Sequence, residues 1–263
     1  MDRSTPLERE DFLSIAPQQE WDLGQEIQNE LRRTEFLKGR LLAHILSPGL
    51  PTIGRRSKGN DPLWPNHILG SISHKRGDVV TCVTARGQAI GLGIDIEDPT
   101  LFPEKVEKAI CTPEDLTLLR ANLSKYSSQS LVIASAAKQS PCKGKIASSP
   151  TAPHNDEIGI LRQVGARPEE SLRARPSTAE KTALTLIFSL KEALFKSLFP
   201  TTRVWFGFQD AYLAQWDDSS REAKLVLKKD LTLAFPAGHI FKAHYDWIEL
   251  SSIPYLLCSL LIE

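Results

Sequence analysis

The spacing of apolar and polar positions predicts helices in two separate parts of this chain of 263 residues. Apolar residues recur at helical spacing from Gln25 to Leu46, where Ser47-Pro48-Gly49 ends the pattern. A second helical pattern includes Phe188–Lys196, continues to Leu198 and ends at Pro200. Two shorter helices are expected over Leu101–Ile110 and from Thr112, the N-cap before Pro113, to about Leu123.

The same patterns predict two groups of strands. Gly70–His74 and Val79–Thr84 form the first group, and the second of these is expected to pair with Gln88–Ile96 as a hairpin turned at Arg86-Gly87, which would bring His74 and Asp95 onto neighbouring strands. After Pro200 an antiparallel meander is expected. Its strands are Val204–Phe208, Tyr212–Trp216, Lys224–Leu227, Ile240–Trp247 and Tyr255–Ile262.

Gly91–Glu97 combines a strand pattern with two acids. Its isoleucines alternate with Asp95 and Glu97, so a strand would bury the isoleucines and place both carboxylates on the opposite face. Magnesium is typically held by one or two carboxylates together with a phosphate, which fits this pair. On the later helix, Glu192 lies one turn before Lys196 and is a candidate third acid. Taken singly, an acidic strand end and a surface ion pair are the commoner interpretations, and only the combination favours a metal site.

Basic residues gather in the first part of the chain. The helix after Gln25 carries Arg33 and Arg40, and the flexible loop at 54–59 carries Arg55 and Lys58. A basic helix face is most often solvated, but the loop that follows is well suited to phosphate, and the two together could hold a polyanion. His74, which is followed by two further cations, could be structural or could join them.

The composition describes a globular protein with no global electrostatic field. Lys and Arg number 32 and Asp and Glu also number 32, so an anionic ligand must be met by a local cluster, and nucleic-acid or membrane-surface binding is not indicated. No apolar run approaches the ~18 residues of a spanning helix, and we expect a cytoplasmic protein. Buried free thiols are expected at all four cysteines, namely Cys82, Cys111, Cys142 and Cys258.

Between 125 and 180 the chain is rich in Ala, Ser and Pro and has no sustained period. Such a composition leaves too little apolar surface to offset the entropy of ordering. We therefore predict an insertion that is largely disordered or weakly helical, that can be removed, and whose closure does not unfold the rest of the chain.

An ordered set of motifs resembles the 4'-phosphopantetheinyl transferases, specifically the enterobactin-synthase-associated type. Each motif alone is weak, but their order along the chain is specific. They are Arg33-x-x-Phe-x-x-Gly-Arg40, Pro62-x-Trp-Pro65, Gly70-Ser-Ile-Ser-His74, Gly93-Ile-Asp-Ile-Glu97, Thr112-Pro113-Glu114 and Phe188-Ser-x-Lys-Glu-Ala-x-Phe-Lys196.

The resemblance implies an α+β fold of two similar halves related by a pseudo-twofold axis, each a small antiparallel sheet packed with helices, with coenzyme A in the cleft between them. The halves would be 1–90 and 91–263, the second interrupted by the insertion at 125–180. A monomer is expected. The family transfers the phosphopantetheine arm of coenzyme A to a serine of an apo acyl or peptidyl carrier protein and releases adenosine 3',5'-bisphosphate.

The resemblance also implies roles for individual residues. Magnesium would be held by Asp95, Glu97 and Glu192, and Lys196 would lie near the pyrophosphate. The base would be Glu192 or a metal-bound water, and the sequence does not choose between them. Contacts to coenzyme A phosphates are implied for Arg40, Lys58 and His74, with Arg33, Arg55 and Ser73 as further positions.

Two competing hypotheses remain beside the transferase. A coenzyme A or carrier-protein binding module could have lost turnover through the insertion, although the three acids and Lys196 are all present. Another magnesium-dependent phosphoryl transferase is disfavoured because the sequence has no P-loop or kinase signature.

Overall fold

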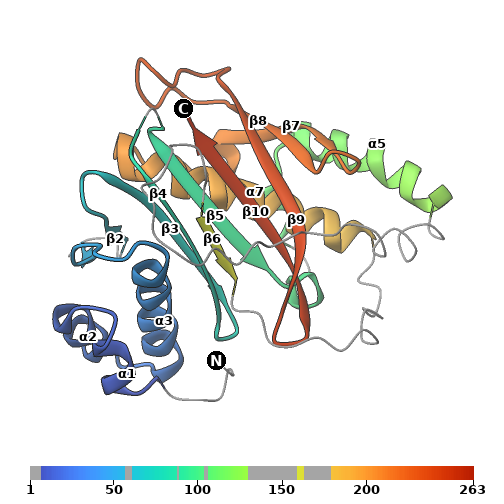
Figure 1. Ribbon diagram of the computed structural model, residues 1–263. Helices are drawn as coiled ribbons and strands as arrows, with labels where there is room; N and C mark the ends of the chain where they lie inside the picture. The colour runs from blue at the N-terminus through green and yellow to red at the C-terminus, as the bar shows by residue number, and fades with distance from the viewer. Residues whose placement is uncertain (1–6, 57–60, 88, 104–105, 130–158, 163–178) are drawn as a thin grey trace.

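The chain folds into helices and small antiparallel sheets, as the sequence predicts (Figure 1). The structure is a computed structural model and describes residues 7–56, 61–87, 89–103, 106–129, 159–162 and 179–263. Two sheets, one of three strands and one of five, carry most of the architecture, and a further pair of short strands lies beside them.

The three-stranded sheet is antiparallel throughout and has the order β3-β4-β6. Its strands are β3 (Ile68–Lys75), β4 (Asp78–Ala85) and β6 (Gly159–Arg162). Helix α3 (Glu30–Leu46) packs against β3 and β4, and its N-terminus is capped by the Asn29 side chain, which accepts a hydrogen bond from Arg32 N at 3.0 Å. The small elements around α3 are α1 (Arg9–Leu13), α2 (Gln18–Gln25), β1 (Gly54–Arg55) and β2 (Pro62–Leu63).

The five-stranded sheet has the order β5-β10-β9-β8-β7, also antiparallel. Its strands are β5 (Gly91–Glu97), β7 (Ala211–Asp217), β8 (Glu222–Leu227), β9 (Ile240–Leu250) and β10 (Ile253–Ile262). Helix α7 (Ala179–Thr202) covers one face of it, over β5 and β10 (Figure 1). The remaining helices are η1 (Pro99–Leu101), α4 (Glu107–Ile110), α5 (Pro113–Gln129) and η2 (Phe208–Asp210).

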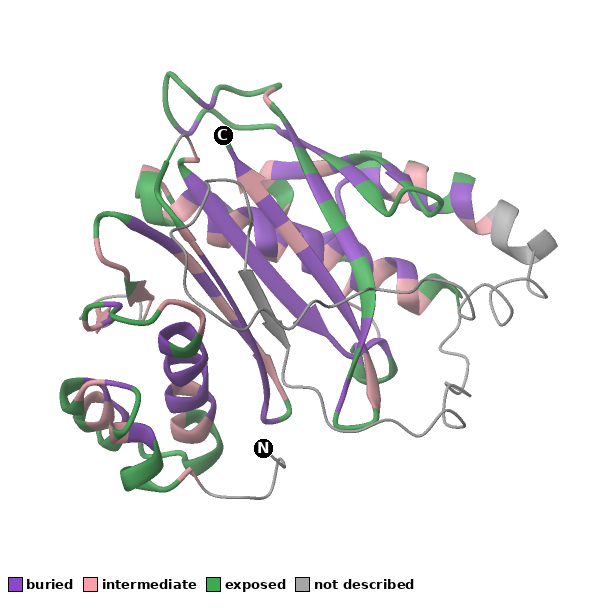
Figure 2. Cartoon of the chain, in the orientation of Figure 1, coloured by how far each residue is buried: buried purple, intermediate pink, exposed green. Residues whose placement is uncertain are grey.

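The two sheets meet where β3 runs alongside β5. These strands are joined by serine side chains: Ser71 Oγ accepts from Ile94 N at 3.0 Å, and Ser73 Oγ accepts from Ile96 N at 3.1 Å. Ile94 and Ile96 are fully buried in an apolar cluster that also takes side chains from β3, β4, β9 and β10. β5 is therefore buried along its whole length (Figure 2), which fixes its polar face as firmly as its apolar face.

Several expected elements differ in the structure. The prediction that Val79–Thr84 pairs with Gln88–Ile96 in a hairpin is wrong, because β4 pairs with β3 and β6 whereas β5 pairs with β10. Alternation shows which residues share a face but cannot choose the partner strand. Val204–Phe208 forms no strand, and among the described residues of Leu101–Ile110 the helical ones are Leu101, in η1, and those of α4. Helix α7 runs two residues past Pro200.

The range 125–180 contains more regular structure than its composition predicts. Residues 125–129 extend α5, residues 159–162 form β6, and residues 179–180 begin α7. β6 pairs with Val80–Val83 of β4, so the four residues of β6 are ordered, and the expectation that the insertion is largely disordered or weakly helical stays a prediction. The rest of the range lies outside the described residues.

Three further expectations bear on the fold. Cys82, Cys111 and Cys258 are buried free thiols as predicted, and Cys142 lies outside the described residues. Burial raises the pKa of the Cys82 and Cys111 thiols to about 12. None of the described helices is both long and apolar enough to span a membrane. The division into halves near residue 90 falls between β4 and β5 and stays a prediction.

Candidate functional site

Two glycines bring α7 directly against β5. Gly91, Gly93, Asp95 and Glu97 share one face of the strand, opposite the buried isoleucines. A β-carbon at Gly91 would lie 2.5 Å from Ser197 O, and one at Gly93 would lie 2.7 Å from Ser197 N, both too close for any side chain. The glycines thus allow helix and strand backbones to touch, and the acids that follow them reach the side chains of α7.

Asp95, Lys196 and Ser73 form the centre of the site. Lys196 Nζ donates to Asp95 Oδ1 at 2.6 Å and to Ser73 Oγ at 3.2 Å, and Ser73 Oγ donates to Asp95 Oδ1 at 2.9 Å. Asp95 is 4% exposed, and the Lys196 side chain is 29% exposed. An ammonium that is held on a buried carboxylate and still reaches solvent can meet an incoming anion.

Glu97 and Glu192 complete an acidic group on this face. Glu97 lies two residues beyond Asp95, and its Oε2 forms an ion pair with Lys75 Nζ at 2.5 Å. Glu192, on α7, is half-buried and interacts electrostatically with Lys196, Asp95 and Glu97. Glu192 thus lies within electrostatic range of the other two acids and of the lysine that the sequence singled out.

Burial controls the protonation of two of these acids. It raises the pKa of the Glu192 carboxyl, an effect that Lys196 opposes and the other two carboxylates reinforce. Burial also raises the pKa of Glu97, and here Lys75 is the main opposing influence. Carboxyls destabilised as anions in this way attract cations and accept protons more readily than exposed ones.

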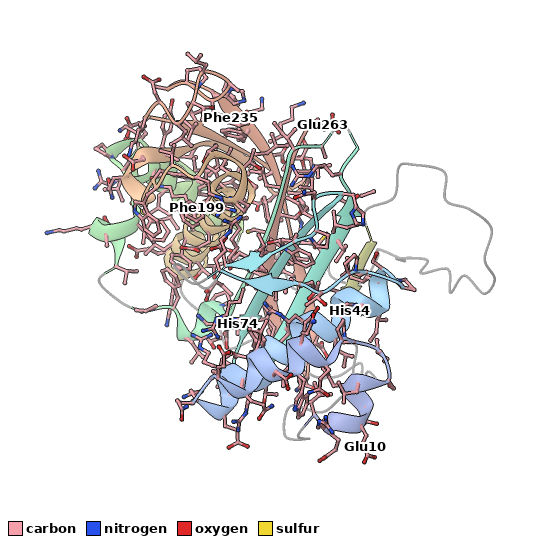
Figure 3. All side chains as sticks on the ribbon, turned by 90° about the vertical axis from the view of Figure 1, so that its left-hand side faces the viewer. Glu10, His44, His74, Phe199, Phe235 and Glu263 are labelled. Carbon is pink, nitrogen blue, oxygen red and sulfur yellow. The ribbon has the colours of Figure 1, made fainter. Side chains whose placement is uncertain are left out.

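His74 lies at the edge of this group and is turned toward α3. Glu35 Oε2 is 3.2 Å from His74 Nδ1, and Arg32 Nη1 is 2.8 Å from the same nitrogen. Burial lowers the pKa of His74, opposed by Glu35. Figure 3 labels His74 and His44 along the side of the molecule that carries α3. The expectation that His74 and Asp95 lie on neighbouring strands is confirmed, although His74 faces the helix.

The residues expected to contact phosphate differ in their burial and in their partners. Arg40 is 3% exposed, with its Nη2 donating to Gly54 O at 3.2 Å and its guanidinium 3.4 Å from the Phe36 ring centre. Burial lowers the pKa of Arg40 to about 10. Arg55 is close enough to act on Arg40 electrostatically and lies 3.7 Å from Glu26, whereas Arg33 is half-buried in the first turn of α3. Lys58 lies outside the described residues.

A second lysine fixes the helix that carries Glu192 and Lys196. Lys191 is 3% exposed and donates to Ile110 O at 2.8 Å, to Phe208 O at 2.8 Å and to Asp115 Oδ2 at 2.5 Å. Asp115 also accepts from Thr112 N and Leu213 N. All three ammonium protons have acceptors, so Lys191 points away from the site and orients α7 by joining it to its neighbours.

Sequence reasoning missed the roles of Lys75, Glu35 and Lys191. Lys75 is two residues after Ser73 and so shares the face of β3 that meets β5, a signal that the strand period contains. Glu35 and Lys191 gave no such signal. Their partners, Gly77 and Asp115, are 42 and 76 residues away along the chain.

Comparison with known proteins identifies the family of this chain. A model of the 4'-phosphopantetheinyl transferase N-terminal domain matches residues 28–84, and a model of the 4'-phosphopantetheinyl transferase superfamily matches residues 147–245. Together the two matches cover more than half of the chain. The chain belongs to the 4'-phosphopantetheinyl transferase superfamily. Asp95 and Glu97 lie between the two matched ranges, so their assignment depends on the motif and the geometry.

Two curated members of the superfamily are similar to this chain. The 4'-phosphopantetheinyl transferase PptT of Mycobacterium tuberculosis is 27% identical over 193 residues, which are 72% of this chain and 61% of that protein. The 4'-phosphopantetheinyl transferase Npt of Nocardia iowensis is 22% identical over 223 residues, which are 82% of this chain and 74% of that protein. The match thus spans about three fifths of the length of the mycobacterial relative.

The superfamily implies a magnesium ion, and the residues fit an open site for one. Asp95 Oδ2 is buried without a hydrogen-bond partner, although Oδ1 of the same carboxylate has two. In the part of the chain that the structure describes, no three His, Cys, Asp or Glu side chains are placed to hold a metal on their own. Magnesium commonly takes one or two carboxylates and completes its shell with water and phosphate, and Asp95 with Glu97 suits that arrangement.

Proposed function

We propose that this protein transfers the 4'-phosphopantetheine arm of coenzyme A to a serine of an apo carrier protein in a magnesium-dependent reaction that releases adenosine 3',5'-bisphosphate. The observation that carries the proposal is the contact of Lys196 with Asp95 and Ser73 beside two further acids whose pKa values are raised by burial. The superfamily membership supplies the substrates, and these residues supply the chemistry.

Phosphoryl transfer needs its charge neutralised where it develops. Lys196 is suited to this because its ammonium is held at a buried carboxylate and remains partly exposed. Asp95 and Glu97 would hold the magnesium ion, and the bound ion would neutralise pyrophosphate oxygens. Glu192, on α7, lies within electrostatic range of both acids. Ser73 accepts from Ile96 N and Lys196 and donates to Asp95, so it positions the other groups rather than reacting itself.

The attacking serine of the carrier must lose a proton. Glu192 suits the role of base because burial raises its pKa toward neutral pH, where a base accepts protons efficiently, and because Lys191 fixes the adjacent backbone. We propose Glu192 as this base. The alternative is a metal-bound water, which would leave transfer only weakly sensitive to replacing Glu192 with Gln.

The basic residues of the N-terminal part would hold the coenzyme A phosphates. His74 lies at the edge of the acidic group and its side chain is 35% exposed, but its ring would have to leave Arg32 and Glu35 to contact a phosphate. Lys58, Arg55 and Arg33 are proposed as further phosphate contacts, whereas the Ser73 hydroxyl is already used by Asp95, Lys196 and Ile96 N. Arg40 is buried under Gly54 and Phe36, so a direct contact would require the strand pair β1–β2 to move.

The resemblance to the enterobactin-synthase-associated type selects the first carriers to test. A peptidyl carrier domain of siderophore synthesis is the proposed partner, which would place the enzyme in secondary metabolism. Acyl carrier proteins of fatty-acid and polyketide synthesis are the comparison set. We propose that the enzyme acts as a monomer in the cytoplasm.

One experiment tests the function directly. The protein is incubated with coenzyme A, magnesium and each apo carrier in turn, and the carrier is examined by mass spectrometry for one added phosphopantetheine arm. Modification that disappears with a chelator and returns with magnesium supports the proposal. No modification of any carrier, together with retained binding of coenzyme A, would support a binding module without turnover.

A further inference from the structure

The turn between β3 and β4 sets two cations against two successive acids at the end of β5. Lys75 Nζ is 2.5 Å from Glu97 Oε2, and Arg76 Nη1 is 2.9 Å from Asp98 Oδ2. The transfer chemistry above uses neither cation. Their positions on one short turn allow the two ion pairs to be compared directly.

The pair of Arg76 with Asp98 is the fixed one. Asp98 is 1% exposed, and both of its oxygens are used: Oδ2 by Arg76, and Oδ1 by Thr100 N at 2.9 Å and Thr100 Oγ1 at 2.6 Å. Arg76 has a φ of 55° and is followed by Gly77 with a φ of 83°, the left-handed backbone that a tight two-residue turn requires. This pair therefore anchors the turn to β5.

The pair of Lys75 with Glu97 is the exchangeable one. Lys75 Nζ and Glu97 Oε2 are in contact, but the Lys75 side chain is 31% exposed while that of Glu97 is 9% exposed. A lysine ammonium is strongly hydrated and sits on a flexible stem, so it can leave for water at little cost. Glu97, being largely buried, cannot follow it and needs another cation in its place.

Each acid of β5 is thus matched with its own lysine: Asp95 with Lys196 from α7, and Glu97 with Lys75 from β3. Asp95 still has a buried oxygen without a hydrogen-bond partner. We propose that Lys75 is an exchangeable counterion of Glu97, which competes with the divalent cation and so sets the metal affinity of the site. This rests on the proposed function, because it takes Glu97 to be a metal ligand.

Competition between Lys75 and the metal ion predicts the direction in which each variant changes the metal affinity. Lys75→Met removes the competitor, and since partly exposed ion pairs contribute up to about 1 kcal/mol, metal binding should tighten roughly two- to fivefold. Lys75→Arg keeps a cation and should not tighten binding. Arg76→Met is the matched control. It removes the same charge at the position next to Lys75, but Arg76 pairs with Asp98, which is not a proposed metal ligand.

The test is a titration of each full-length protein with Mn²⁺, a paramagnetic substitute for magnesium. Free Mn²⁺ is measured by electron paramagnetic resonance. Coenzyme A is present and the carrier is omitted, so no turnover occurs. Tighter binding by Lys75→Met alone supports the proposal. Unchanged or weaker binding by Lys75→Met overturns it, and so does equal tightening by Arg76→Met, which would reveal a general charge effect.

A second measurement shows whether a change in metal affinity is caused by misfolding of the variant. The melting temperature is measured against Mg²⁺ concentration, and the curve of Lys75→Met should shift to lower concentration while its melting temperature without metal remains within a few degrees of the parent protein. Failure of the parent protein to bind Mn²⁺ would overturn both this proposal and the metal site. Normal binding and carrier modification by the parent, with unaltered affinity in Lys75→Met, would overturn this proposal alone.

Discussion

Gly93 of β5 lies so close to Ala193 of α7 that a β-carbon at residue 93 would overlap the carbonyl oxygen of Ala193 and stand 2.7 Å from Ser197 N. The obstructing atoms belong to a helix backbone, which cannot turn aside as a side chain can. The contact sets the distance between Asp95 and Lys196, and so a single methyl group here should disturb both fold and function.

We expect Gly93→Ala to destabilise the protein by at least about 2 kcal/mol, because overpacking of a filled core commonly costs 1–3 kcal/mol. Carrier modification should fall as well. Gly207→Ala is the matched control, since a β-carbon at Gly207 meets nothing within 4 Å. Urea unfolding of both variants checks this, and equal stabilities would show that α7 and β5 are farther apart than described.

Lys191→Met should destabilise the protein by about 3–5 kcal/mol, the usual cost of removing one partner from a buried ion pair. Asp115 would remain buried, opposite an apolar side chain, and two backbone carbonyls would lose their donor. Lys224→Met, at an exposed position of β8, is the control and should change stability little. A small loss in Lys191→Met would mean that the network does not hold α7 in place.

The raised pKa of Glu192 predicts a stability cost that depends on pH. Between the ordinary value of 4.5 and the higher folded pKa, the folded state binds more protons than the unfolded state, so stability falls as pH rises through this window. Glu192→Gln is neutral at every pH and should therefore be more stable than the parent protein at about pH 8, with the advantage fading below about pH 4.5.

Denaturant unfolding across this pH range measures the Glu192 effect. Glu222→Gln, at an exposed position of β8, serves as the control. If Glu192→Gln were no more stable than the parent at pH 8, the carboxyl would be adequately solvated or paired in the folded protein. Its proposed role as a base poised by burial would then lose its support.

Joining Ser124 to Lys181 through a short Gly/Ser linker removes residues 125–180 and with them β6. The sequence predicts that this stretch is dispensable, but the structure pairs β6 with Val80–Val83, so the deletion should expose one edge of β4. We expect a folded variant that is less stable by about 1–3 kcal/mol, as a few ladder hydrogen bonds are lost.

Hydrogen exchange at the β4 amides tests the consequence of that deletion. Faster exchange at Val80–Val83 in the deletion variant, with β9 and β10 unaffected, is the expected result. Identical exchange in β4 would show that β6 gives the strand no protection, and unfolding of the whole variant would show that the insertion has become part of the core.

The sequence predicts which residues form the polar face of β5, but it does not predict which strand pairs with β5. Alternation in Gly91–Glu97 predicts that Asp95 and Glu97 share a face, and helical spacing predicts the same for Glu192 and Lys196, because both depend only on local periods. Pairing of β5 with β10 joins residues about 160 positions apart, and alternation is silent about that.

Contacts between distant elements explain the other differences. Lys191 was indistinguishable in the sequence from a solvated helix lysine until α4, α5 and η2 were placed around it. Arg40 shows the reverse: a residue expected to face a ligand is buried by Phe36 and Gly54. For both residues, contacts with elements distant in the sequence determine where the long side chain lies, and the local sequence pattern does not predict those contacts.

The central claim is that Asp95, held between Lys196 and Ser73, belongs to the phosphoryl-transfer centre. The most direct measurement is the rate of carrier modification by Asp95→Asn at saturating coenzyme A, with Asp246→Asn, at an exposed position of β9, as the control. We predict a loss of at least about 100-fold for Asp95→Asn, the scale on which such electrostatic contributions act, with the fold retained. A near-parental rate for Asp95→Asn would contradict the account.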